Sequence, residues 1–410
     1  MQDNEKKPAL RFKGFTDPWE QRKLGELVEI GDIDHRMPET VDVGIPYLMT
    51  GDFCGTNELN FNGVKLISEI EYNQLSQKIK PEQGDILFAR YASVGTVRYV
   101  DFTRKFLISY SCAIIKKGKK INSQYLYHFI TSDEAQKQIK LQINTGSQSN
   151  IGIDSMKNNI LVQMPLIDEQ VQIANMLTNL DHLITLHQRK YEKLVNIKKS
   201  MLDKMFPQNG VSVPEIRFKG FTDPWEQRKL GEIAFFSKGV GYSKNDLCEE
   251  GTPIILYGRL YTKYETCIFD VDTFVKEKAG SVYSKGGEVI VPASGETAED
   301  ISIASVVVKP GILLGGDLNI VSPTAEYDSA FLALTISSGA THKYLSSLAQ
   351  GKSVVHLHNA DIQSVSAKFP TKREQEKIHL LFGKINTLIT LHQREHIKPI
   401  LEVKRVKRNE

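Results

Sequence analysis

The sequence predicts an α+β protein made of two similar α/β domains, each followed by a long helix. Two repeats indicate this organisation. The sixteen residues RFKGFTDPWEQRKLGE occur at 11–26 and again at 217–232, and the seven residues LITLHQR occur at 183–189 and again at 388–394. The spacings are 206 and 205 residues, far above the period of a solenoid repeat. The two halves of the chain are therefore copies of one unit.

The length and composition suit two soluble domains. A chain of 410 residues exceeds one ordinary hydrophobic core, since domains of about 150 residues are typical. The formal net charge of +3 is too small to indicate a nucleic-acid partner by itself, so any basic surface must be local.

The chain shows no targeting signal in its sequence. It opens MQDNEKKPAL without an apolar leader, and no apolar run approaches the roughly 18 residues of a membrane span, so we expect a cytoplasmic protein without membrane contact. Cys54, Cys112, Cys248 and Cys267 form no CxxC pair, and we expect buried thiols rather than disulfides or metal ligands.

Between the repeated ends the two halves diverge, although short landmarks remain. GIPYLMTGDF at 44–53 matches GTPIILYGRL at 251–260, and GDILFARYAS at 84–93 matches GEVIVPASGE at 287–296. A Gly-Asp or Gly-Glu turn before an apolar run predicts a buried strand that leads into a loop. The scaffold is therefore repeated while the loops differ.

Each half ends in a predicted long helix, with apolar residues spaced alternately by threes and fours as in a coiled coil. About 38 helical residues give a length of roughly 57 Å. Pro207 ends the first helix, and Pro399 is expected to kink or fray the last turns of the second. The heptad positions of the two helices include Ile173, Leu177, Leu180, Ile184, His187, Tyr191, Leu194, Met201 and Met205, then Ile378, Phe382, Ile385, Ile389, His392, His396, Pro399, Val403 and Val406.

Catalytic motifs are missing from the sequence. An adenine methyltransferase would need a cofactor loop of the FxGxG kind and a turn like NPPY or DPPY, and neither occurs. GKS at 351–353 lacks the leading glycine of a phosphate-binding loop, and GVGYSK at 239–244 lacks the third glycine of a dinucleotide fingerprint. The pairs His392/His396 and His356/His358 have no convincing third metal ligand nearby. We therefore expect a binding protein with no catalytic residue, cofactor or metal of its own.

The paired motifs resemble the specificity subunit of type I restriction-modification enzymes. Each predicted helix starts with the pattern P-x-x-x-E-Q-x-x-I and contains LITLHQR, and FTDPWEQRKLGE precedes each domain. The resemblance implies two long antiparallel coiled-coil helices that separate two target recognition domains about a pseudo-twofold axis. The implied segments are an N-terminal segment at 1–14, recognition domains at 15–165 and 221–370, helical spacers at 166–206 and 371–410, and a linker at 207–220.

The resemblance also implies the function and the partners. Such a subunit is not an enzyme by itself. It binds a bipartite, asymmetric target in double-stranded DNA, with one half-site for each domain. Two adenine methyltransferase subunits carry S-adenosylmethionine, and two restriction and translocation subunits that use ATP and Mg²⁺ join them. The surfaces for the other helix and for the partners would include Ile173, Leu177, Leu180, Ile184, Tyr191, Leu194, Ile378, Phe382, Ile385 and Ile389.

Lysine and arginine would bind phosphates, and polar side chains in the divergent loops would read base edges. In the first domain the candidates are Arg90, Tyr91, Ser93, Asn144, Ser147, Gln148 and Asn150, with Lys116, Lys117, Lys119 and Lys120 for phosphates. In the second domain they are Arg259, Tyr261, Lys263, Ser294, Lys352, Ser353, His356, His358 and Asn359. The segment KKGKK at 116–120 is equally well interpreted as a solvated turn. Trp19 and Trp225 lie in the repeat, so we expect them to pack identically rather than stack on bases.

Two other functions stay open at this point. The first is a coiled-coil adaptor whose paired domains bind proteins and never contact DNA, which the small net charge permits. The second is a self-contained methyltransferase or nuclease, which the missing motifs disfavour. The recognised bases, the length of the gap between half-sites and the presence of a restriction subunit do not follow from the sequence.

Overall fold

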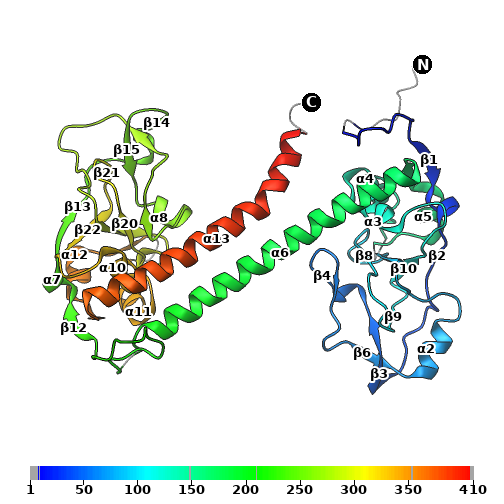
Figure 1. Ribbon diagram of the computed structural model, residues 1–410, viewed down its shortest axis with the longest axis horizontal. Helices are drawn as coiled ribbons and strands as arrows, with labels where there is room; N and C mark the ends of the chain where they lie inside the picture. Colours follow the sequence, from blue (N-terminus) through cyan, green and yellow to red (C-terminus); the bar gives the residue numbers. More distant parts are fainter. Residues whose placement is uncertain (1–7, 9, 147–148, 209, 352–353, 407–410) are drawn as a thin grey trace. The chain divides into compact units, whose positions relative to one another are not determined.

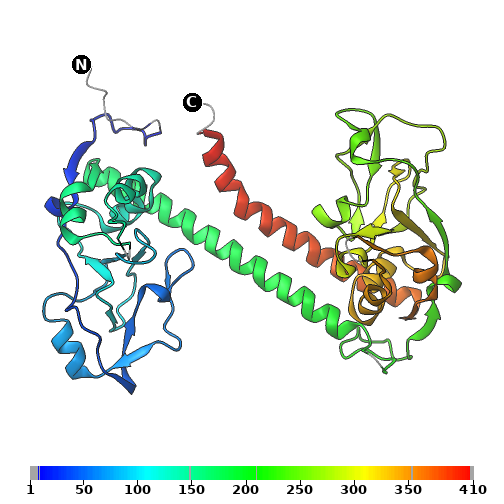
Figure 2. The same cartoon turned by 180° about the vertical axis from the view of Figure 1, so that it is seen from behind.

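The computed structural model describes residues 8, 10–146, 149–208, 210–351 and 354–406, with side chains up to position 393. The chain divides into two compact units, the first up to Leu186 and the second from His187. The boundary falls inside α6 (Ile167–Met205), which is one continuous helix in Figures 1 and 2.

The first unit is built from short strands and helices before α6. Its strands are β1 (Glu20–Lys23), β2 (Ile30–Gly31), β3 (Thr40–Leu48), β4 (Phe53–Cys54), β5 (Glu58–Leu59), β6 (Lys65–Ile67), β7 (Ile86–Ala89), β8 (Val97–Tyr99), β9 (Leu107–Ile108), β10 (Cys112–Ile115) and β11 (Leu161–Met164). Its helices are α1 (Leu24–Leu27), η1 (Thr50–Asp52), α2 (Glu69–Leu75), α3 (Ser123–Thr131), α4 (Asp133–Leu141) and α5 (Ile153–Asn159).

The second unit repeats this organisation and contains more strands. Its strands are β12 (Glu226–Lys229), β13 (Ala234–Lys238), β14 (Leu247–Cys248), β15 (Thr252–Ile255), β16 (Cys267–Ile268), β17 (Phe274–Val275), β18 (Glu288–Pro292), β19 (Ser294–Gly295), β20 (Ser305–Val307), β21 (Leu313–Leu314), β22 (Leu318–Pro323), β23 (Val355–His356) and β24 (Ser366–Phe369). Its helices are α7 (Leu230–Ile233), η2 (Lys244–Asp246), α8 (Arg259–Thr262), α9 (Ala298–Ile301), α10 (Ser329–Ile336), α11 (Gly339–Leu348), α12 (Asn359–Ser364) and α13 (Lys372–Val406).

The sheets of the two units have matching strand orders. The main sheet runs β2-β10-β7-β8 in the first unit and β13-β22-β18-β20-β16 in the second. A smaller sheet runs β6-β3-β9 in the first unit, and its counterpart is β17-β15-β21 within β14-β17-β15-β21. The central strands β7 and β18 are fully buried, as expected for the apolar runs that follow the Gly-Asp and Gly-Glu turns. The topology is therefore repeated where the sequence has diverged.

The repeated sequence RFKGFTDPWEQRKLGE closes each unit onto the start of its long helix. Its EQRK segment forms β1, which pairs antiparallel with β11, and β12, which pairs antiparallel with β24. Upstream of these strands, the guanidinium of Arg11 donates to both carboxylate oxygens of Glu169 at 2.7 and 2.8 Å. Arg217 donates to Glu374 in the same way, at 2.8 Å for both bonds. We call these two ion pairs the latches.

The glutamine after each latch glutamate connects the long helix to its domain. The side chain of Gln170 donates to the carbonyl of Pro165 and accepts from the N–H of Asn122, the N-cap residue of α3. Gln375 does the same with Pro370 and with Asp328, the N-cap residue of α10. The pattern P-x-x-x-E-Q is therefore a set of buried contacts that orient each helix on its domain.

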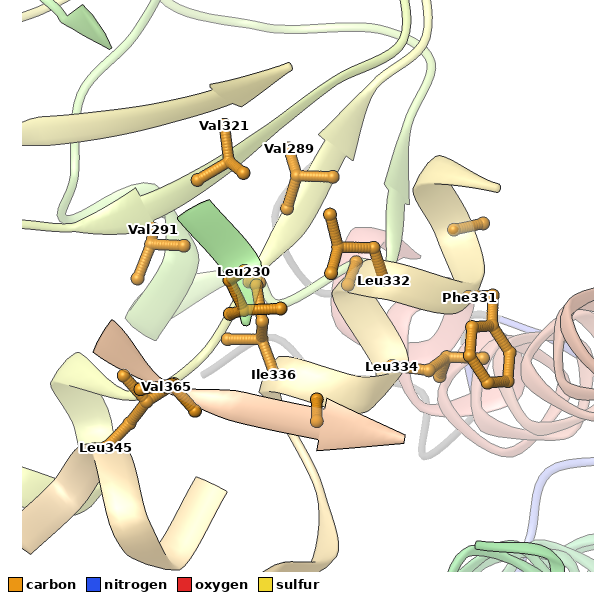
Figure 3. Packing of buried hydrophobic residues seen from close by; sticks show 14 of the residues in the cluster. Leu230, Val289, Val291, Val321, Phe331, Leu332, Leu334, Ile336, Leu345 and Val365 are labelled. Carbon is orange, nitrogen blue, oxygen red and sulfur yellow. The ribbon is translucent and has the colours of Figure 1, made fainter. Parts of the chain in front are cut away.

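Helix α10 lies inside the second unit, between the main sheet and α13. It is hydrophobic all round, as a helix buried on every side must be. Figure 3 shows Val289 and Val321 of the sheet on one side of α10. On its α13 side, the ring of Phe331 stacks on Phe206, whose centroid lies 5.5 Å away, and Phe206 also contacts Phe382 of α13.

Within the second unit, α13 and the C-terminal part of α6 run antiparallel. His187 of α6 contacts His392 of α13 through their Nδ1 atoms at 3.0 Å, whereas Phe206 just after α6 reaches back to Phe382. Residues nearer the end of α6 therefore contact residues nearer the start of α13, as expected for antiparallel helices. The helix continues through Pro399 to Val406, so the expected fraying is not seen, although the ribbon of α13 bends toward its C-terminal end (Figures 1 and 2).

Several smaller expectations are also tested. The four cysteines are free, but only Cys112 is buried; Cys248 and Cys267 are half-buried and Cys54 is exposed, so the expectation of four buried thiols is wrong at these three positions. Trp225 is 3% exposed and packs against Phe206 and Phe331, whereas Trp19 is only half-buried, so the two tryptophans do not pack identically. None of the helices in the described ranges is long and apolar enough to cross a membrane.

Candidate nucleic-acid interface

Candidate residues of the first unit meet at the end of its central strand. Tyr91, two residues after β7, forms an antiparallel bridge with Asn150, and Asn150 forms another with Asn144. The backbone N–H of Asn144 donates to the carbonyl of Asn150 at 2.8 Å, and their side-chain amides are bonded at 3.2 Å. The N–H of Ile151 donates to the carbonyl of Arg90 at 3.1 Å. We call this arrangement the first loop cluster.

The second unit contains the same backbone arrangement after β18. Ser294 pairs with His356 between β19 and β23, and His356 forms a further bridge with Gln350. The N–H of Gln350 donates to the carbonyl of His356 at 3.1 Å, and the N–H of Leu357 donates to the carbonyl of Ala293 at 3.0 Å. We call this the second loop cluster.

Backbone strain accompanies both clusters. Ala92 and Asp317 have φ of 58°, and they are the two non-glycine residues with positive φ in the part of the chain that the structure describes. Ala92 follows Tyr91 directly, and the carbonyl of Asp317 accepts from the N–H of Ala293 at 2.7 Å. A left-handed residue other than glycine costs roughly 1 kcal/mol, and such residues concentrate at functional sites.

The side chains of the two clusters differ although their backbones correspond. The phenol of Tyr91 is replaced by the hydroxyl of Ser294, which lies 3.1 Å from Nδ1 of His356. The amide of Asn150 is replaced by the imidazole of His356, which is exposed and stacked with His358 at an interplanar angle of 3°. Asn144 and its counterpart Gln350 are both exposed amides.

The two candidate arginines are structural residues. Arg90 is 6% exposed, pairs with the buried carboxylate of Asp32 and donates from Nε to the carbonyl of Ile151 at 3.0 Å. Arg259 is 8% exposed and pairs with Glu265 at 2.7 Å and Asp272 at 3.0 Å. Both guanidiniums face carboxylates of their own unit, because a buried charge needs such a partner. This placement gives both arginines a contact within their own unit, and their contact with DNA stays a prediction.

The lysines of KKGKK lie away from the first loop cluster. The segment follows β10, whose C-terminal end pairs with the start of β7, whereas Arg90 and Tyr91 follow the other end of β7. Lys116 bonds Asp85 at 2.6 Å and Glu82 at 2.9 Å, and these bonds outweigh burial and raise the pKa of its ammonium. Lys117, Lys119 and Lys120 are exposed. The turn is therefore held by Asp85, and its exposed lysines form a separate basic surface.

Other candidates of the second unit lie around the second loop cluster. The hydroxyl of Tyr261 donates to the carbonyl of Ser294 at 2.5 Å, and burial raises the pKa of this phenol. Lys263 is exposed and lies 3.3 Å from Asp272. His358 is the N-cap residue of α12, and Asn359 donates to the carbonyl of Ser237 at 2.9 Å. Ser93 is exposed in the first unit. The candidates Ser147, Gln148, Lys352 and Ser353 lie outside the described residues.

The heptad positions divide into two groups. Ile173 packs against the core of the first unit, and Ile378, Phe382 and Ile385 belong to the core of the second. These early positions of each helix therefore bind the helix to its own domain. The later positions Leu177, Leu180, Ile184, Tyr191 and Leu194 are half-buried, and Ile389 is half-buried and packs against the core of the second unit. The described residues contain no group of three His, Cys, Asp or Glu side chains placed to hold a metal.

Sequence reasoning missed Gln350, Asp317 and the role of Asp32. Gln350 could have been found, because it lies 206 residues after Asn144, the same offset as the long repeat. Asp32 and Asp317 give no such signal, since their roles depend on tertiary contacts.

Comparison with known proteins agrees with this architecture. Residues 16–196 and 222–400 match the family described as "Type I restriction modification DNA specificity domain". The type I restriction enzyme MjaVIII specificity subunit of Methanocaldococcus jannaschii is 24% identical over 250 residues, or 58% of each chain. The putative MjaX specificity subunit of the same organism is 24% identical over 240 residues, or 56% of each chain. The matched part thus spans little more than half the length of these relatives.

A solved structure shows the same fold over most of the chain. The S subunit of a type I restriction-modification system from M. genitalium has a TM-score of 0.57 at 15% identity, covering 97% of this chain and 96% of the other. At this identity the likeness shows the fold alone. Since the family matches both halves of the chain, including the domains and most of each long helix, the protein belongs to the type I restriction-modification DNA specificity family.

Proposed function

We propose that this chain is the DNA specificity subunit of a type I restriction-modification complex. In this proposal each unit binds one half of a bipartite, asymmetric DNA target. The chain itself has no catalytic residue and no cofactor. Two methyltransferase partners supply S-adenosylmethionine and modify adenine, and two restriction partners supply ATP-driven translocation and cleavage with Mg²⁺.

The observation that carries the proposal is the pair of loop clusters. A protein that reads two different half-sites needs the same backbone frame twice, with different polar side chains on it. The backbone bonds of Asn144 with Asn150 recur in Gln350 with His356, whereas the side chains at 150 and 356 differ. Because base edges are read by hydrogen bonds from fixed side chains, this combination supports two reading sites.

Exposed leucines of the long helices support two equivalent partners. Leu183 and Leu186 are 49% and 38% exposed in the first unit, and Leu388 and Leu391 are 44% and 47% exposed in the second. These leucines come from the identical LITLHQR segments, in which the neighbouring isoleucines Ile184 and Ile389 are less exposed. Exposed apolar residues that are repeated identically fit a partner that binds twice. We assign this surface, the leucine ridge of each helix, to the methyltransferase partners.

The proposal is tested with the chain purified together with its methyltransferase partners. The complex is incubated with S-adenosylmethionine and a pool of duplexes that carry a randomised segment, and the methylated duplexes are sequenced. We expect two short specified elements separated by an unread gap of constant length. Each specified base pair should contribute roughly 1 to 3 kcal/mol of discrimination.

Two controls separate the alternatives. The chain without its partners should methylate nothing, and activity of the chain alone would contradict a non-catalytic subunit. A complex that methylates the pool without sequence preference would favour the adaptor function, in which the two domains bind proteins only.

A further inference from the structure

We propose that four residues, Asn144 and Asn150 in the first unit and Gln350 and His356 in the second, are equivalent specificity-determining positions. This inference rests on the proposed function and deepens it. It states which side chains select the bases in each half-site.

The first step of the argument is the register of the backbone. Asn144 and Gln350 are 206 residues apart, and so are Asn150 and His356. Within each pair of bridge residues the backbone N–H and carbonyl groups are bonded in both directions, at 2.8 and 3.3 Å in the first unit and at 3.1 and 2.8 Å in the second. Two segments with little common sequence therefore keep the same pair of backbone hydrogen bonds.

The second step is the attachment of these residues to the core. Asn150 is bridged to Tyr91, and His356 is bridged to Ser294. Tyr91 and Ser294 each lie two residues after the end of a fully buried central strand. On the other side a short helix begins at once, α5 after Gly152 and α12 after His358. The side chains at 150 and 356 are thus held on rigid elements, as discrimination between bases requires.

The third step is the chemistry of the side chains. Asn144 and Gln350 are exposed amides, and a side-chain amide can form a bidentate contact with adenine in which its NH2 donates to N7 and its oxygen accepts from N6–H. His356 is exposed, whereas Asn150 is half-buried and bonded to the amide of Asn144 at 3.2 Å. Positions 144 and 350 therefore favour an A·T pair in each half-site, and positions 150 and 356 make the halves different.

The experiment exchanges residues between equivalent positions. Asn150→His and His356→Asn are made in the full chain, assembled with the methyltransferase partners and assayed on the randomised duplex pool. We expect Asn150→His to change the preferred base pair at one position of one half-site, and His356→Asn to do so in the other half-site only. Asn144→Ala should lower the preference for one A·T pair by about 5- to 150-fold.

The matched control is Asn62→His. Asn62 is exposed in the turn between β5 and β6, outside the first loop cluster, and its change should leave every preference intact. If Asn150→His fails to give a folded chain by circular dichroism, position 144 tests the first half-site by itself: Asn144→Ala should lower the A·T preference, whereas Asn144→Gln, which keeps an amide, should retain it.

The outcomes distinguish this inference from the function on which it rests. A wild-type complex without sequence preference would overturn both. A selective wild-type complex whose preferences are unchanged in all of the substituted chains that fold would overturn only the assignment of these four positions.

Discussion

At the scale of single residues, the latches give a structural reason for the arginine that opens the sixteen-residue repeat. Arg217 and Glu374 are 11% and 1% exposed, and Arg11 and Glu169 are 12% and 0% exposed. A buried carboxylate requires a partner with matched geometry, and the fork of arginine supplies two parallel bonds. A change in either member of a latch therefore leaves a buried charge without its partner. This cost does not depend on which bases the loops of that unit contact.

The first prediction concerns the latch of the second unit. Arg217→Ala should lower the free energy of unfolding of this unit by about 3 to 5 kcal/mol, because Glu374 stays buried without its partner. Denaturant unfolding of the full chain measures the loss. The control is Arg228→Ala, which removes a solvent-exposed pair with Glu226 and should cost much less stability. Equal effects of the two substitutions would contradict a structural role for the latch.

The second prediction concerns the pH dependence of the first unit. Burial lowers the pKa of His128 to about 4, and its Nε2 lies 3.0 Å from the hydroxyl of Thr178 on α6. The unfolded chain binds a proton near pH 6.5, whereas the folded chain does not, so the stability of this unit should fall between about pH 6.5 and pH 4. The loss at pH 4 should be at most about 3 kcal/mol.

The test compares unfolding of the wild-type chain and of His128→Gln at pH 7 and at pH 4.5. Glutamine cannot be protonated, so the substituted chain should lose less stability on acidification than the wild type, even if it starts lower at pH 7. An equal loss in both chains would assign the acid sensitivity to other groups.

At the scale of elements, the sequence predicts the helices better than the loops. A heptad pattern indicates α6 and α13 directly, because helical spacing depends on residues close together in the chain. The early heptad positions Ile378 and Phe382 were predicted to face the other helix or the partners. Both pack in the core of the second unit, where Phe382 also contacts Phe206 just after α6, since the pattern shows an apolar face and not what covers it. The spacing of apolar residues does not indicate helix α10, because this helix is apolar on all sides.

In the candidate site, too, the sequence predicts features that depend on neighbouring residues but not contacts between residues far apart in the chain. Tyr91 was chosen because it follows a predicted strand, and Asn144 and Asn150 were chosen as polar residues of a divergent loop; the structure brings these three together. Arg90 was chosen by the same reasoning and is instead paired with Asp32, which lies 58 residues earlier in the chain. A sequence pattern cannot tell an arginine that faces solvent from one with a buried carboxylate beside it. The repeat offset would have identified Gln350.

The third prediction concerns the leucine ridge of α13. Leu388→Asp together with Leu391→Asp should abolish binding of one methyltransferase partner and leave the fold intact, because both side chains are exposed in this chain but would place charges in an apolar contact. Size-exclusion chromatography with light scattering would show a complex smaller by one partner. Arg373→Asp, an exposed change in the first turn of the same helix, is the control and should assemble fully.

At the scale of the whole molecule, the contact between His187 and His392 gives the duplication a geometric meaning. The two residues are 205 positions apart, the same offset as the LITLHQR repeats that contain them. Within the second unit, the two long helices therefore meet at matching positions of the duplicated sequence.

The last prediction concerns the unread gap between the half-sites. If the paired helices set this gap, lengthening both should lengthen it. The contact of His187 with His392 places the segment after Lys193 opposite the segment after Ile385, so insertions at these two points keep the helices in register. Three heptads add about 31 Å to each helix, close to the 34 to 36 Å of one DNA turn, so the recognition domains would again meet the same groove face. We expect the complex to methylate the same two elements with a gap longer by about nine or ten base pairs, read by sequencing methylated duplexes. An insertion with serine at the heptad positions, which cannot pair, should give no constant longer gap. A complex that carries the apolar insertions and still methylates only at the original gap would show that the helices do not set the spacing.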